Sequence, residues 1–280
     1  MTEQRTEQYR TTLDIAGFKL ALRSTSRDAD QRIRTRYHDF ITDNSAPQID
    51  ITLSVVPGAQ FVEIKPGPWV IEVEYADNRL FYQSYLERGE VNLISGVGTL
   101  EMAPEASIEN FLRTVVAWLC VSSDALMLHA AGVIRDGLGY VFFGPSGAGK
   151  TTTSRISAKV AEVVSDDLVI IRVENGIGKL YGVPFRGEMS EAPRANQSAP
   201  LKAIFRLRQD TAHFLEQTTS VTSTAELVAA SPFVVQELSL SARLIEVCDK
   251  ISRSVPILTL HFKRDDGFWK VIDEYFEDVS

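Results

Sequence analysis

One short stretch constrains this chain more than any other: residues 141–154, which read VFFGPSGAGKTTTS. It ends an apolar run with three glycines in six positions, followed by a lysine and a row of threonines. Each glycine loses more conformational entropy on folding than other residues, so three so close together need a reason. We therefore expect the backbone here to take a shape that side chains would obstruct.

Residues 144–151 fit the pattern G-x-x-x-x-G-K-[ST], in which main-chain N–H groups wrap a polyphosphate. In such a loop the lysine places its charge on the β- and γ-phosphates and the hydroxyl of Thr151 ligates Mg²⁺. An apolar strand predicted over residues 140–143 runs into the loop, and a helix-compatible segment follows it, as an anion site requires. The alternative is a glycine-rich turn that binds nothing. The predicted nucleotide-binding residues are Gly144, Pro145, Ser146, Gly147, Ala148, Gly149, Lys150, Thr151 and Thr152.

Two adjacent acids, Asp166 and Asp167, lie between two apolar segments, fifteen positions after Thr151. A phosphate loop needs a carboxylate at a strand end to hold Mg²⁺. Of two carboxylates, one can hold the metal and the other can accept a proton from an attacking hydroxyl. Alone, the pair would be interpreted as a solvated turn, but the phosphate loop favours the functional interpretation. Which aspartate has which role stays open.

Three other residues are weaker candidates. His129 ends an apolar run fifteen positions before Gly144, where a buried structural histidine is the alternative. Arg186 would suit contact with a transferring phosphoryl group, and Glu188 would suit a metal. A surface turn with an ordinary ion pair explains the last two residues equally well.

Composition excludes some classes of function. The formal net charge of -8 and the pI of about 5.2 argue against a general nucleic-acid-binding protein. No apolar run is long enough to span a bilayer, and the polar first residues do not resemble a signal peptide. Cys120 and Cys248 lie in apolar helical patterns, which predicts buried thiols in a reducing compartment. We therefore expect a cytoplasmic protein with no nucleic-acid or membrane partner.

The pattern of the chain changes near residue 103. Residues 1–103 indicate mainly strands, separated by breaks rich in Gly, Pro and Asn, with one polar helix over residues 28–41. We expect an antiparallel sheet with one dry face here, as an accessory or acceptor-binding part. Residues 104–280 mix the two periodicities: strands over 126–134, 140–143, 162–165, 168–173, 203–207 and 257–262, and helices from 104, over 241–254 and over 268–276. The predicted fold class is α/β in the mixed α+β sense.

Several motifs together resemble the catalytic region of the HPr kinase/phosphorylase family. They are HAAG at residues 129–132, GPSGAGKT at 144–151 and SDD at 165–167, in the family's order and near its spacing. The loop and its flanks are also similar to ATP-dependent phosphoenolpyruvate carboxykinase, which shares the fold of the kinase core. The resemblance spans roughly residues 126–190 and joins several elements in order, which makes it moderately specific. It implies a P-loop kinase core for residues 104–280.

By this resemblance, Lys150 and Thr151 serve ATP or another nucleoside triphosphate and its Mg²⁺. Asp166 and Asp167 are metal ligand and general base, and His129 supports the base or the phosphates. The implied activity is ATP- and Mg²⁺-dependent transfer of a phosphoryl group to a hydroxyl. The hydroxyl belongs to a serine of a protein or peptide, or to a small molecule.

Arg186 and Glu188 correspond only loosely to an arginine and an acid that the family places after the second strand. A nucleotide-binding regulatory or assembly module with little or no turnover is the alternative function, because it needs the same loop but no acceptor. A carboxykinase-like reaction is a third choice, but the further acidic and histidine ligands that it requires are replaced by Leu168-Val169-Ile170. The preference among ATP, GTP and pyrophosphate stays open, as does the oligomeric state, a homo-oligomer included.

Overall fold

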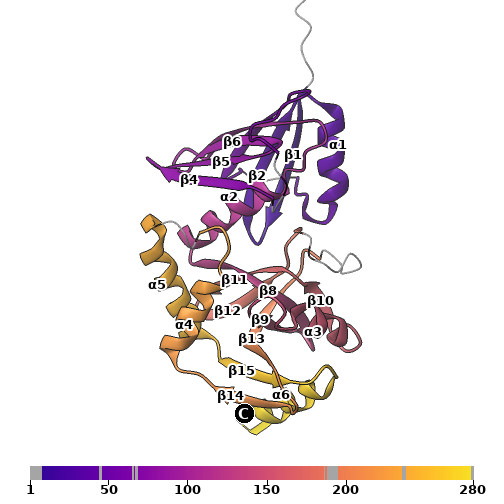
Figure 1. Cartoon of the computed structure of the whole chain (residues 1–280), viewed down its shortest axis with the longest axis vertical. Helices are drawn as coiled ribbons and strands as arrows, with labels where there is room; N and C mark the ends of the chain where they lie inside the picture. Colours follow the sequence, from indigo (N-terminus) through magenta and orange to yellow (C-terminus); the bar gives the residue numbers. More distant parts are fainter. Residues whose placement is uncertain are drawn as a thin grey trace, which may run out of the picture. The chain divides into compact units, whose positions relative to one another are not determined.

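The computed structural model describes residues 8–43, 46–64, 66, 69–185, 187, 195–234 and 238–278. The chain divides into two compact units, Met1–Val116 and Ala117–Ser280. In the described part, six α-helices and two mixed sheets confirm the predicted mixture of α and β structure (Figure 1). The division between the units falls inside helix α2 (Glu109–Ser122), later in the chain than the change of pattern at residue 103.

The first unit contains a seven-stranded sheet of order β1-β2-β3-β7-β6-β5-β4. Its strands are β1 (Tyr9–Ile15), β2 (Phe18–Ser24), β3 (Ile49–Val55), β4 (Ile71–Ala76), β5 (Arg79–Ser84), β6 (Glu87–Asn92) and β7 (Val97–Met102). The expected antiparallel sheet is wrong at β3, which runs parallel to both β2 and β7. Helix α1 (Arg27–Arg36) and a short 3₁₀ turn (His38–Phe40) connect β2 to β3, and a crossover of this kind is what parallel pairing requires. Figure 1 shows α1 beside β1 and β2, on which it packs.

Alternation runs without a break over residues 12–22 and 91–100, which suggests one strand in each segment, but both segments contain the turn of a hairpin. The first turns at Ala16 and Gly17, which both have positive φ, so β1 and β2 pair over their whole length. The second turns between Asn92 and Val97, where Gly96 has a φ of 70°. Both errors have one cause: alternation continues through a tight turn, so periodicity alone does not mark where the chain reverses.

The second unit contains an eight-stranded sheet that closes on itself. Its strands are β8 (Ala125–Arg135), β9 (Leu138–Phe143), β10 (Glu162–Ser165), β11 (Leu168–Glu174), β12 (Ile177–Tyr181), β13 (Ser198–Gln209), β14 (Phe214–Gln217) and β15 (Ile257–Phe262). The pairings run from β8 through β9, β13, β12 and β11 back to β8. Strand β13 is parallel to both β9 and β15, and the remaining pairs are antiparallel. The strands predicted for this region are confirmed, whereas β12 and β14 were not predicted.

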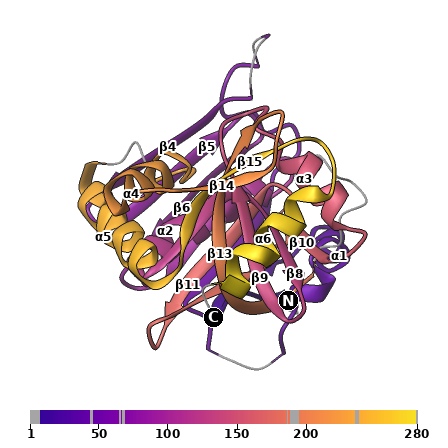
Figure 2. The same ribbon diagram turned by 90° about the horizontal axis from the view of Figure 1, so that it is seen from below.

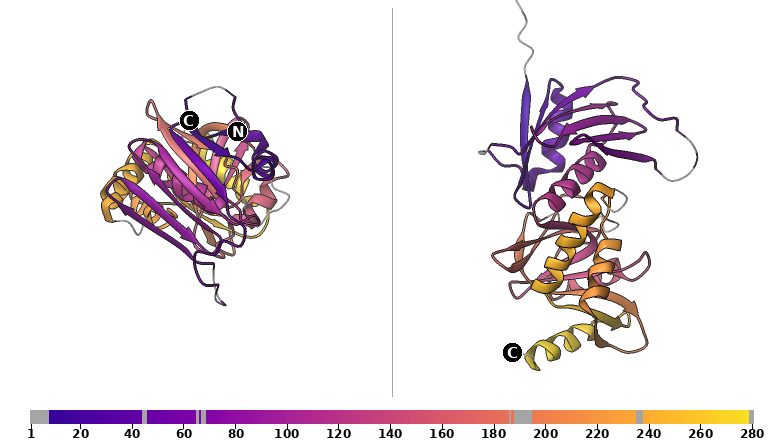
Figure 3. Two further views of the ribbon diagram at one scale, coloured as in Figure 1. Left: turned by 90° about the horizontal axis from the view of Figure 1, so that it is seen from above. Right: turned by 90° about the vertical axis from the view of Figure 1, so that its left-hand side faces the viewer.

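Four helices pack on this sheet: α3 (Lys150–Ser157), α4 (Ser220–Ala229), α5 (Leu238–Ser254) and α6 (Gly267–Asp278). Figure 2 shows α6 lying across the strands, and its Trp269 packs edge-on against Tyr140 and Phe142 of β9. Helices α4 and α5 lie side by side (Figure 3). Helix α4 was not predicted, because its sequence, SVTSTAELVA, is rich in residues of low helix propensity.

Both cysteines are buried and free, as predicted. Burial raises the pKa of the Cys248 thiol to about 12 and raises that of Cys120 as well. No helix in the described ranges is both long and apolar enough to cross a bilayer.

One buried carboxylate in the first unit depends on its neighbours. Glu87 is 3% exposed, and its Oε2 accepts hydrogen bonds from the hydroxyls of Tyr82, at 2.8 Å, and Ser84, at 3.1 Å. Burial raises the pKa of the Glu87 carboxyl above its usual range, while these donors oppose the shift. A carboxyl whose pKa is raised in the folded state stabilises it fully only below the unfolded pKa. That contribution is lost as the pH rises through the folded value.

We expect Tyr82→Phe to destabilise the protein at pH 7 by about 1–3 kcal/mol, because a buried carboxyl loses a hydrogen-bond donor. The cost should shrink below about pH 4, where the carboxyl is protonated in both states. Urea unfolding of the parent and the variant at the two pH values measures the difference. An equal cost at both values would mean that Tyr82 acts through packing alone.

Candidate functional site

The glycine-rich loop joins the end of β9 to the start of α3, as the motif predicts. Gly149 caps α3 with a φ of 114°, and a Cβ there would lie 2.6 Å from Cζ of Phe262 on β15. Gly147 also has positive φ, 77°, but a Cβ there would meet nothing within 4 Å. The side-chain amide of Gln209 donates to the carbonyl oxygen of Gly147 at 2.7 Å. Phe262 therefore packs against the loop at Gly149, and Gln209 is hydrogen-bonded to the loop at Gly147.

Lys150 lies over the first half of the loop. Its side chain is buried, and its Nζ donates to the carbonyl oxygens of Gly144, at 3.0 Å, and Pro145, at 3.4 Å. A phosphate-loop lysine serves the β- and γ-phosphates. The ammonium group is thus placed next to the residues that open the loop.

The hydroxyls of α3 fall into two groups. Thr153 donates to the carbonyl oxygens of Gly149 and Lys150 at 3.1 and 2.8 Å, and Ser154 donates to that of Lys150 at 3.1 Å. Thr151 and Thr152 are partly accessible, and their hydroxyls have no hydrogen-bond partner in the described part of the chain. Of the hydroxyls in the first turn, the two nearest the loop are the ones open to a ligand.

The loop and the aspartate pair lie on the two sides of β8. Ala130 pairs with Phe143, the last residue of β9, and its N–H donates to the carbonyl oxygen of Asp167 at 2.9 Å. Neighbouring strands lie about 4.8 Å apart, so the main chains of Phe143 and Asp167 are separated by roughly 10 Å. That span is short enough for a nucleotide and its metal to contact both sides.

His129 lies on β8 at this place and contacts Asp167. Its Nε2 is 3.1 Å from Oδ1 of Asp167, and the two side chains are 50% and 26% exposed. It is the exposed residue in a buried stretch that runs from Ala125 to Val133, so it is not a core histidine. Ser165 Oγ accepts the N–H of Asp167 at 3.4 Å and helps to shape the turn.

Asp166 is buried, at 5% exposure, and lies against the main chain of Gly187. A Cβ at Gly187 would lie 2.2 Å from Oδ1 of Asp166, so no larger residue fits without a shift. Arg186 and Glu188, on either side of Gly187, lie outside the described residues.

The residues present suit a metal that arrives with its substrate. Among the described residues, no group of three or more His, Cys, Asp or Glu side chains could hold a metal ion by itself. Mg²⁺ keeps several waters and is usually bound through one or two carboxylates together with substrate phosphates. Thr151 and the aspartate pair would be such a smaller set of ligands.

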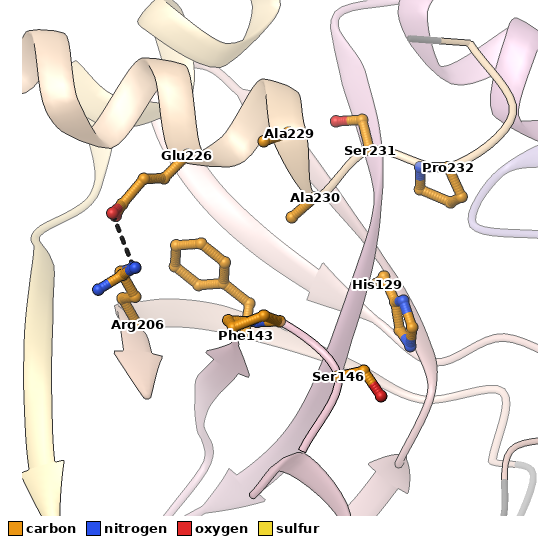
Figure 4. Close-up of a pocket in the computed structure, with 11 residues that line it drawn as sticks. His129, Phe143, Ser146, Arg206, Glu226, Ala229, Ala230, Ser231 and Pro232 are labelled. Carbon is orange, nitrogen blue, oxygen red and sulfur yellow. Dashed lines mark ion pairs between the residues drawn. The ribbon is translucent and has the colours of Figure 1, made fainter. Parts of the chain in front are cut away.

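A pocket of about 360 Å³ opens beside the start of the loop. Figure 4 shows His129 and Ser146 at one end, the ring of Phe143 in the middle, and Arg206 paired with Glu226 at the other end. The C-terminal end of α4 forms another wall. Sequence reasoning missed Arg206 and Glu226, because they belong to no motif and Glu226 lies on the unpredicted helix.

We expect Gly149→Ala and Gly147→Ala to differ sharply. Each places Ala at positive φ, which costs about 1–2 kcal/mol. Only Gly149→Ala also forces a methyl group into the ring of Phe262, which should cost about 1–3 kcal/mol more. Thermal unfolding of the two variants measures the difference.

The double variant Gly149→Ala/Phe262→Leu is the control. It should recover part of the loss specific to Gly149→Ala, since the smaller side chain leaves room for the methyl group. Equal stability of the two single variants would contradict the packing of Phe262 against the loop.

Comparisons with known proteins give a family, and similarity to a solved structure is weak. Residues 105–277, more than half of the chain, match the family described as SynChlorMet cassette protein ScmC. The solved structure of the Hpr(Ser) kinase/phosphatase from Coxiella burnetii aligns over 55% of this chain and 97% of that chain. The sequence identity is 8% and the TM-score 0.30, which is too low to carry a conclusion about activity. No curated protein matches the chain in sequence. From the family match, the chain belongs to the family of the SynChlorMet cassette protein ScmC.

Proposed function

We propose that this protein is a phosphotransferase of the HPr kinase type, which moves the terminal phosphoryl group of ATP, or of another nucleoside triphosphate, to a hydroxyl. One observation carries the proposal: a glycine-rich loop with a buried lysine lies across one strand from an aspartate that contacts an exposed histidine. In this proposal the second unit is a P-loop kinase core. The β-rich first unit presents or selects the acceptor.

In phosphoryl transfer the protein mainly positions the reacting groups and neutralises their charge. The loop N–H groups and Lys150 would hold the phosphate chain. Mg²⁺, held by Thr151, Asp166 and the phosphates, would neutralise charge that develops on the transferring group.

Asp167 would accept the proton of the acceptor hydroxyl, because it is the more accessible aspartate and His129 holds it at 3.1 Å. The hydroxyl oxygen then bonds to the γ-phosphorus. The bond between this phosphorus and the β–γ bridging oxygen breaks, and a nucleoside diphosphate leaves. Arg186 and Glu188 keep their predicted roles as a phosphoryl contact and a further metal ligand.

Lys150→Ala should weaken binding of Mg–ATP at least tenfold, or about 1.4 kcal/mol, because the phosphates lose a charge contact. Thr151→Val should lower the part of the affinity that depends on Mg²⁺. Titration calorimetry with and without the metal separates the two effects.

Thr153→Val is the matched control for the hydroxyl. Its bonds go to carbonyls of its own helix, so it should lower stability but keep the Mg²⁺ dependence. If the parent gives no heat with ATP, GTP or pyrophosphate, the proposed function is wrong.

Asp167→Asn should lower phosphate release from Mg–ATP, with water as the acceptor, by about 10²–10⁴-fold, because the general base is lost. Affinity for the nucleotide should change little. Asp136→Asn, at an 86% exposed side chain in a turn, is the control and should leave the rate unchanged. A rate unaffected by Asp167→Asn would remove this residue as the base.

A further inference from the structure

The pocket beside the loop has a defined position relative to a bound phosphate chain. It is lined by Phe143, Gly144, Pro145 and Ser146, the first half of the loop, and not by the residues that begin α3. Lys150 Nζ also lies at the carbonyl oxygens of Gly144 and Pro145. Because such a lysine serves the β- and γ-phosphates, the terminal phosphate would face this pocket. The space is therefore where an acceptor, rather than a nucleobase, would approach.

The two ends of the pocket differ in chemistry (Figure 4). His129, which contacts Asp167, lies at the end next to Ser146. The middle is apolar, with Phe143, Ala229 and Ala230. A slim ligand with its hydroxyl near His129 would reach toward Arg206 and Glu226.

The far end is a charge pair with one unsatisfied atom. Arg206 Nε is 2.7 Å from Oε1 of Glu226, and the side chains are 34% and 24% exposed. Glu226 Oε2 is buried and has no hydrogen-bond partner among the described residues. Burial raises the pKa of this carboxyl, which Arg206 opposes. An unpaired buried oxygen is costly, and a ligand that donates a hydrogen bond to it would remove that cost.

The charges select the kind of ligand that can complete this oxygen. A second anion would be repelled by Glu226, and a second cation by Arg206. An uncharged amide matches both residues, because its N–H can donate to the carboxylate and its C=O can accept from the guanidinium. The carboxylate must turn to present Oε2, and rotation about its last bond is soft.

We propose that this pocket is the acceptor subsite, that Arg206 and Glu226 determine its specificity, and that it takes a hydroxyl-bearing residue of a peptide through an adjacent amide group. The identification of the ligand as a phosphoryl acceptor rests on the proposed function. The preference for an amide rests on the pocket alone.

Three small hydroxyl compounds test the preference: N-acetylserinamide, which is neutral, glycerate, which is an anion, and ethanolamine, which is a cation. Ligand-observed NMR titrations of the full chain without nucleotide measure their affinities. N-acetylserinamide should bind at least tenfold more tightly than either charged compound. No detectable binding of N-acetylserinamide, or equal affinity for all three, would overturn the proposal.

The variant Glu226→Gln should change the affinities for two of these compounds in opposite directions. Its amide still accepts from Arg206 but places a donor where Oε2 was and removes the negative charge. Affinity for N-acetylserinamide should fall at least tenfold while affinity for glycerate rises. A residue that only supports the fold would not move the two affinities in opposite directions, and an unchanged order would refute the assignment.

Glu246→Gln is the matched control, on the neighbouring helix α5. Its carboxylate pairs with Arg243 at 3.0 Å, is 66% exposed and does not line the pocket, so all three affinities should stay as in the parent. If Mg–ATP does not bind but the amide preference holds, the phosphotransferase fails and the peptide subsite stands. If Mg–ATP binds but the amide preference is absent, the peptide subsite fails and the phosphotransferase proposal stands.

Discussion

The pairing of strand β8 on both of its edges is the constraint on which the candidate site depends. One edge takes β9, which leads into the phosphate loop, and the other takes β10 and β11, which carry the aspartate pair. His129 comes from β8 itself. Main-chain hydrogen bonds therefore bring three separate segments within two strand spacings, and no side-chain contact is needed for that purpose. The spacing between the loop and the aspartates is therefore set by the main-chain pairing of a buried, closed sheet.

Around this frame the site keeps several polar groups in costly surroundings. Lys150 and Asp166 are buried, and Lys150 Nζ is satisfied by the carbonyl oxygens of Gly144 and Pro145. One oxygen of Glu226, in contrast, has neither solvent nor a hydrogen-bond partner in the described part. Removing charged or polar groups from water without full compensation is unfavourable, so folding alone does not favour such an arrangement. Thr153 and Ser154 show the contrasting case, since their hydroxyls are satisfied by their own helix. The Glu226 oxygen is thus a group that a ligand in the pocket could complete.

The sequence predicted some features much better than others. Six of the eight strands of the second unit were predicted because they are apolar runs, and the buried cysteines were predicted because they lie within apolar helical patterns. The parallel pairing of β3 was missed, because no local sequence pattern specifies which strands pair with each other. Helix α4 was missed because its Thr, Ser and Val residues have weak helix propensity. It is capped by Thr219 and packs on α5, with Ser223 and Leu227 buried, so its stability comes from tertiary contacts.

The sequence by itself predicted the glycine-rich loop between β9 and α3. Its glycines, lysine and threonines are contiguous, and their chemistry follows from local backbone geometry. It also named His129 and Asp167, but it did not say that they touch. Only the tertiary structure decided that contact, which joins residues 38 positions apart, and the pairing of Arg206 with Glu226, which are 20 positions apart. The physical reason is that contacts between distant segments depend on strand order and on the packing of helix α4, which has little intrinsic stability. No short stretch of the sequence determines either of them.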